Sequence, residues 1–95
     1  MKQQSIKDLL HGELISNEVI DLIFTNLGNQ ILDQKEVIVD LKDVTFISVY
    51  FLERLELFLE KVKELNAIIK IINVQPTIYK VFRVSKVKAV LDTIC

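Results

Sequence analysis

The run from Glu36 to Leu52 predicts a strand, a short turn and the start of a helix, and open α/β domains usually place their function at such a turn. Its groups that could do chemistry are hydroxyls and two aspartates. Asp40 and Asp43 flank the end of an apolar stretch, and two carboxylates at that spacing could bind a cation or receive a phosphoryl group. We favour structural roles, in which Asp40 accepts hydrogen bonds from a neighbouring loop and Asp43 lies in a turn. The run contains no glycine, histidine or cysteine.

Other catalytic patterns are missing from the sequence. His11 is the single histidine, so neither a hydrolase triad nor a histidine-rich metal site is predicted. Gly12 and Gly28 do not form a glycine-rich phosphate loop before a helix. Cys95 is the single cysteine, and we expect a free thiol there. We therefore predict no enzyme activity, no catalytic residues, no metal and no cofactor.

Composition predicts one folded domain over residues 1–95. Hydrophobic residues make up 51% of the chain, with two glycines and one proline, which is typical of a compact fold rich in helices and strands. Apolar runs are shorter than a membrane span and the start resembles no signal segment, so we expect a cytoplasmic protein without membrane insertion. Basic residues gather in the last third, without a nucleic-acid-binding motif, so no nucleic-acid partner is expected.

Hydrophobic periodicity predicts alternating strands and helices. We expect a strand over Lys7 to Leu14, then a helix capped by Ser16 or Asn17. The buried stripe of that helix is Ile20, Ile23, Phe24, Leu27 and Ile31. The remaining elements are expected to be a strand over 37–41, a helix over 48–66, a strand over 67–74, a helix from Pro76, and a helical turn or edge strand over 88–94.

This order predicts an α/β fold with a mixed or mostly parallel sheet of four to five strands and helices mainly on one face. The strands over 37–41 and 67–74 are rich in β-branched residues, and their nearly continuous apolar pattern predicts burial on both faces.

The helix over 48–66 carries apolar residues on its charged side. Val49, Tyr50 and Leu57 project there, next to Glu53 and Arg54. Such a cluster with a charged rim is typical of a protein-binding hot spot. The alternative is that the turn folds over these side chains or that a dimer hides them. Self-association through an edge strand or this helix face is also plausible.

Three stretches resemble the STAS domain, the family of bacterial anti-sigma factor antagonists, stressosome subunits and the cytoplasmic tails of sulfate transporters. They are Gly12-Glu13-Leu14, Val37 to Leu41 followed by Val44 to Ile47, and Ile71 to Val74 before Pro76. The resemblance implies a binding module whose strand-to-helix turn meets a protein partner, such as an anti-sigma factor or a kinase-like regulator.

The turn departs from the antagonist pattern, in which a serine after an aspartate is phosphorylated. Here the aspartate position is Ser48 and the phosphoacceptor position is Val49. We therefore expect a non-enzymatic regulatory module that contacts its partner through the turn 45–50 and the outer face of the helix. The predicted contact residues are Thr45, Ser48, Val49, Tyr50, Arg54 and Leu57.

Two alternatives to that function stay open. In one, a partner kinase phosphorylates Ser48. In the other, the start of the helix senses a nucleotide or another anion, because the first turn of a helix has free backbone N–H groups.

Overall fold

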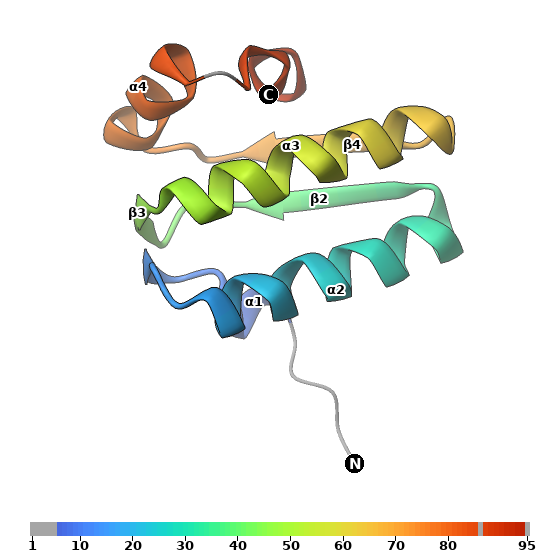
Figure 1. Cartoon of the computed structure of the whole chain (residues 1–95), viewed down its shortest axis with the longest axis horizontal. Coiled ribbons are helices and arrows are strands. Elements are labelled where there is room, and N and C mark those ends of the chain that lie inside the picture. Colours follow the sequence, from blue (N-terminus) through green and yellow to red (C-terminus); the bar gives the residue numbers. More distant parts are fainter. Residues whose placement is uncertain (1–5, 86, 95) are drawn as a thin grey trace.

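The computed structural model describes residues 6–85 and 87–94 as helices and strands in alternating order (Figure 1). The elements are α1 (Ile6–Leu9), β1 (Gly12–Leu14), α2 (Asn17–Gln34), β2 (Glu36–Asp40), β3 (Val44–Ile47), α3 (Val49–Glu64), β4 (Ile68–Ile72), α4 (Pro76–Val84) and the 3-10 helix η1 (Lys88–Thr93).

The described strands form two parallel pairs, β1 with β3 and β2 with β4. The predicted parallel α/β character is confirmed, but a single sheet of four to five strands is not what forms. The cause is a turn between β2 and β3, where the Val44 N–H donates to the Leu41 carbonyl at 3.1 Å. The turn ends the pairing of β2 with β4 before the pairing of β3 with β1 begins.

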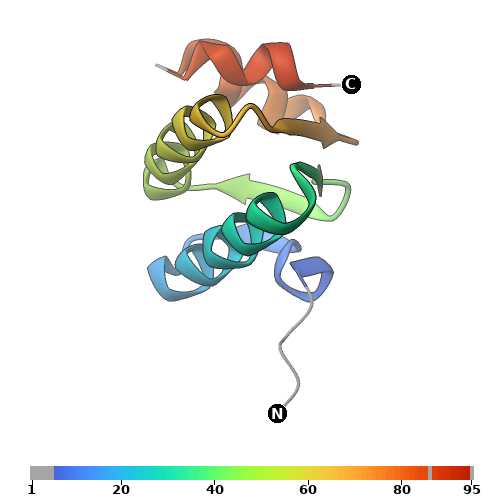
Figure 2. The ribbon, with the colours of Figure 1, turned by 90° about the vertical axis from the view of Figure 1, so that its right-hand side faces the viewer.

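Helices α2 and α3 cover one face of the β2–β4 pair, as the two perpendicular views show (Figures 1 and 2). Val37 and Val39 point into the core, whereas Ile38 is 52% exposed. The prediction that these strands are buried on both faces is therefore wrong. Apolar residues on the outward face, Ile38 and Ile68, gave the sequence its continuous apolar pattern.

The predicted strand over Lys7 to Leu14 is only partly correct. Its second half is β1, but its first half is the single helical turn α1, in which the Leu10 N–H donates to the Ile6 carbonyl at 3.1 Å. Leu9 and Leu10 are both buried, and burial of two consecutive residues fits a helix better than the alternating pattern of a strand. Gly12, with φ of 65°, separates the helical turn from the strand.

The long helices match their predictions. Ser16 caps α2 by accepting a hydrogen bond from the Val19 N–H at 3.4 Å, and the five predicted stripe residues of α2 are all buried. Phe24 on α2 meets two aromatic rings of α3, with ring centroids 5.3 Å from Phe51 and 5.8 Å from Phe58. This aromatic contact fixes α3 beside α2.

The C-terminal segment combines the two predicted possibilities. Residues 88–93 form η1, and Ile94 then makes a parallel bridge with Ile71 of β4. The predicted free thiol of Cys95 lies outside the described residues. Across the part of the chain that the structure describes, no helix is long and apolar enough to span a bilayer.

Candidate protein-binding surface

The predicted contact region lies where β1 and β3 end and α3 begins. Leu14 and Ile47 are register partners, and both are buried. The Ser48 N–H donates to the Leu14 carbonyl at 3.1 Å, which holds the start of α3 against the end of β1. Residues 45–47, predicted as part of the turn 45–50, belong instead to β3, so the turn itself is short.

Three exposed apolar side chains occupy this end of the molecule. Ile15 is 53% exposed, Phe46 46% and Val49 72%, and we call them the turn patch. Thr45 is exposed in the same strand as Phe46. The backbone pairing brings the ends of β1 and β3 together, and the turn patch consists of Ile15 directly after β1, Phe46 in β3 and Val49 at the start of α3.

Val49 was predicted as a contact residue, but Ile15 and Phe46 were missed. Strand alternation could have identified Phe46, because an inward Ile47 places its neighbour outward. Ile15 follows the inward Leu14 in the same way. Neither could be assigned from sequence without knowing that β1 pairs with β3 in this register.

Ser48 is the N-cap of α3. Its Oγ accepts a hydrogen bond from the Phe51 N–H at 3.3 Å, and its backbone is extended. Among the described residues, this is the one hydrogen bond that Ser48 Oγ makes. The geometry is that of a helix cap, with a partly exposed oxygen at the positive end of the helix.

Tyr50 and Arg54 face α2 instead of forming one open patch with Val49. The Tyr50 hydroxyl donates to the Asp21 carboxylate at 2.6 Å, and Arg54 Nε lies 3.5 Å from the same oxygen. The Arg54 guanidinium also lies 5.7 Å from the centre of the Phe24 ring. The hydrogen bond to Asp21 raises the pKa of Tyr50, because ionisation would break it, and partial burial acts in the same direction.

Leu57 is 60% exposed, two turns along α3 from Tyr50. The predicted contact residues are therefore divided between two places. Thr45, Ser48 and Val49 lie at the start of α3, whereas Leu57 lies beyond the contact with Asp21. A helical projection gives angles on one helix and cannot show which side a second helix covers.

Asp40 has the predicted structural role. Its carboxylate accepts hydrogen bonds from the Lys42 N–H at 3.0 Å and from the Asn73 side-chain amide at 3.2 Å. Asp43 lies in the turn before β3, where its carbonyl accepts from the Gly12 N–H at 2.8 Å. Within residues 6–85 and 87–94, no three His, Cys, Asp or Glu side chains come together as a metal site.

Two comparisons bear on identity. A search of curated proteins finds no match. The family model of the STAS domain matches residues 9–94, which covers β1 through Ile94 and includes the whole turn region. This match spans nearly the entire chain and agrees with the parallel strand pairs and with α2 and α3 on one face. The chain therefore belongs to the STAS domain family.

Proposed function

We propose that this chain is a non-enzymatic, cytoplasmic regulatory module that binds a protein partner through the turn patch. The observation that carries the proposal is the exposure of Ile15, Phe46 and Val49 together at the end of β1 and β3. The same turn is where the STAS resemblance implies a partner contact. Large exposed apolar side chains at one place favour association, because a partner would remove them from water.

The hydroxyl-bearing residues Thr45 and Ser48 lie in sequence beside Phe46 and Val49 of the turn patch. Such groups contribute orientation and selectivity more than affinity. Leu57 is a second apolar position on the same helix and would extend the contact along α3. An anti-sigma factor or kinase-like regulator is the partner class that the resemblance favours.

Site-specific photocrosslinking tests the proposal in the cell of origin. A benzoylphenylalanine at position 49 is expected to crosslink a protein partner, identified by mass spectrometry. The matched control places the same photocrosslinker at position 32, where Leu32 is 56% exposed on α2. Equal crosslinking from both positions would argue against a specific surface at the turn.

Binding to the identified partner is then measured with purified variants. Val49→Asp and Phe46→Asp are each expected to weaken binding about tenfold or more, because a carboxylate would have to be buried in an apolar contact. Leu32→Asp should leave affinity unchanged. Wild-type affinity in both turn variants would refute the proposal, provided that thermal unfolding shows both variants to be folded.

A second candidate function is phosphorylation of Ser48 by a partner kinase. The favouring observation is the position of Ser48 Oγ at the N-cap of a helix whose first turn has no acidic residue. A phosphoryl group transferred from ATP to this oxygen would meet the positive end of the helix. Intact-mass spectrometry of protein from its own cells should show one phosphoryl group, lost in Ser48→Ala; its absence under all growth conditions removes this candidate.

A further inference from the structure

Strand β2 has one paired edge and one open edge. The Ile68 N–H donates to the Lys35 carbonyl at 2.9 Å, and the Leu41 N–H donates to the Ile72 carbonyl at 3.0 Å. Because a parallel ladder uses alternate residues of each strand, the N–H and C=O groups of Glu36 and Ile38 point away from β4. Among the described residues, no strand pairs with that edge.

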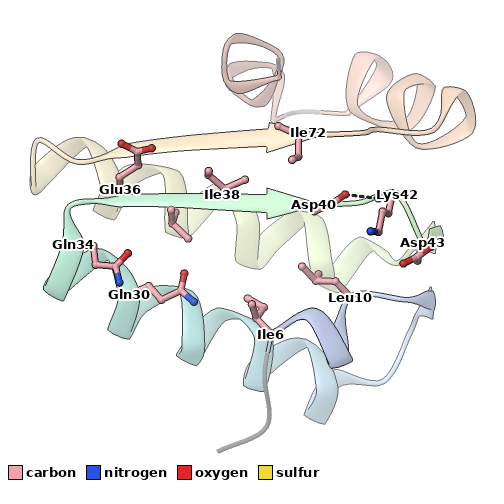
Figure 3. A pocket seen from close by; sticks show the side chains of 11 residues that line it. Ile6, Leu10, Gln30, Gln34, Glu36, Ile38, Asp40, Lys42, Asp43 and Ile72 are labelled. Carbon is pink, nitrogen blue, oxygen red and sulfur yellow. Dashed lines mark hydrogen bonds between the residues drawn. The ribbon is translucent and has the colours of Figure 1, made fainter.

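The open edge exists because the chain before Gly12 leaves the extended conformation. Gly12 contacts the Asp43 carbonyl, and upstream of it the backbone becomes the helical turn α1. Figure 3 shows Ile6 and Leu10 across a gap from β2, whereas Ile72 of β4 lies on the opposite side. A helix in this place leaves the backbone groups of β2 without a neighbouring strand.

The gap is a groove of about 610 Å³. Besides the edge of β2, its lining includes the apolar side chains of Ile6, Leu10 and Ile38 and the amides of Gln30 and Gln34 (Figure 3). Backbone hydrogen-bonding groups beside apolar side chains are what an added strand requires. The five residues of β2 offer an edge about 17 Å long, which suits an extended segment of similar length.

The ends of the groove are acidic. Glu36 lies at the start of β2 and Asp43 follows its end, and both are exposed. Lys42 lies beside Asp43, so the four charged lining residues, Glu36, Asp40, Lys42 and Asp43, carry three negative charges and one positive charge. Neither Glu36 nor Asp43 forms an ion pair within residues 6–85 and 87–94. These two carboxylates favour a segment that carries a lysine or arginine near each end.

A second copy of this chain fits the groove less well. Antiparallel pairing of two β2 strands about Ile38 would place Glu36 of each copy opposite Asp40 of the other, and like charges in direct opposition destabilise a strand pair. Helix α1 also forms the far wall, so an extended segment enters more readily than the edge of a folded domain.

We propose that this groove binds an extended, basic-ended segment of a partner protein, which adds as a strand to the open edge of β2. None of the three turn-patch residues lines the groove. The groove therefore gives the domain a second contact site, one that recognises backbone and charge instead of a folded apolar surface.

A synthetic peptide, acetyl-Lys-Val-Thr-Val-Thr-Val-Lys-amide, tests this proposal with the wild-type chain. Amide hydrogen exchange by NMR should show that saturating peptide slows exchange at Glu36 and Ile38, because their N–H groups become bonded. Val37 and Val39 already donate within the β2–β4 ladder and should change little. No protection at Glu36 and Ile38 despite saturating peptide, or no binding at millimolar peptide, would overturn the proposal.

Two N-methylated peptides provide a matched control for strand addition. One carries N-methyl groups on its first two valines and the other on its two threonines, so the peptides are isomers, and only one of these sets can face β2. The isomer whose N-methyl groups face β2 should lose about tenfold or more in affinity relative to the unmethylated peptide. The other isomer should bind more tightly than this one. Equal binding of the two isomers would overturn strand addition.

The charge requirement is tested with Glu36→Lys/Asp43→Lys, compared with Glu56→Lys/Glu60→Lys on the exposed side of α3. The first double variant should weaken peptide binding about tenfold, since two attractions become repulsions. The second double variant should change it by less than about twofold, and equal loss in both would overturn the charge requirement. Concentration-dependent protection of Glu36 and Ile38 without peptide would assign the edge to a second copy instead.

Discussion

Ser48 determines how α3 begins, and it does so through one side-chain oxygen. Its Oγ satisfies the Phe51 N–H, one of the backbone donors that a helix leaves unpaired in its first turn. Because the first turn has no acidic residue, this oxygen has no neighbouring carboxylate to share that role.

We predict that Ser48→Ala lowers the free energy of unfolding by about 1 kcal/mol. Ser48→Asp should retain most of the wild-type stability, because aspartate also caps and its charge is favourable at a helix N-terminus. Urea unfolding of the three proteins measures the difference. Equal loss in both variants would mean that Ser48 contributes something other than its cap.

Tyr50 provides a prediction about pH. The carboxylate of Asp21 raises the pKa of the Tyr50 phenol above its usual value near 10. In a Tyr79→Phe variant, Tyr50 is the remaining tyrosine, so phenolate absorbance reports it alone. The titration midpoint should lie above pH 10 and move down when Asp21→Asn is added.

The same shift has a consequence for stability. Since the folded-state pKa is the higher one, the contribution of Tyr50 is complete below about pH 10 and disappears as the pH rises through the folded pKa. Adding Tyr50→Phe to the Tyr79→Phe variant should remove this alkaline loss. The Asp21 contact was not predictable from sequence, because residues 21 and 50 are brought together by the packing of α2 on α3.

At the scale of elements, the two glycines lie in opposite backbone environments. Gly12, the first residue of β1, has a φ of 65°, whereas Gly28 lies inside α2. A Cβ built at either position meets no atom within 4 Å. Backbone conformation alone should therefore decide the effect of alanine at each place.

We predict that Gly12→Ala destabilises the fold by about 1 to 2 kcal/mol, the cost of a left-handed conformation for a residue with a Cβ. Gly28→Ala should stabilise it by up to about 1 kcal/mol, because alanine has the higher helix propensity. Thermal unfolding of both variants measures the two signs. Effects of the same sign would show that side-chain contacts, and not φ, control these positions.

The helices were more predictable than the strands for a physical reason. The stripe from Ile20 to Ile31 repeats with helical spacing, and burial against one face follows directly. Ile38 and Ile68 break the corresponding rule for strands, since they are apolar but lie on the outward face. The helical turn before Gly12 has Leu9 and Leu10 buried side by side in the sequence, and a strand pattern based on Leu9, Leu10 and Leu14 did not reveal it.

At the scale of the whole molecule, the C-terminal elements α4 and η1 contribute to the same hydrophobic core as the preceding helices and strands. Phe82 of α4 and Val90 of η1 are both fully buried, in the same cluster as Ile71 of β4. This packing favours one domain, which composition predicted for residues 1–95.

Phe82→Ala tests that prediction of a single domain. Deleting a fully buried phenylalanine should cost about 3 to 5 kcal/mol, a large part of the roughly 5 to 15 kcal/mol typical of a domain. Val84 is 85% exposed on the same helix, so Val84→Ala should change stability by less than about 0.5 kcal/mol. If the chain is one cooperative unit, urea unfolding of Phe82→Ala keeps the wild-type slope, because the same surface becomes exposed in one step. A shallower slope or a second transition would mean instead that α4 and η1 unfold apart from the core formed by α2, α3 and the strands.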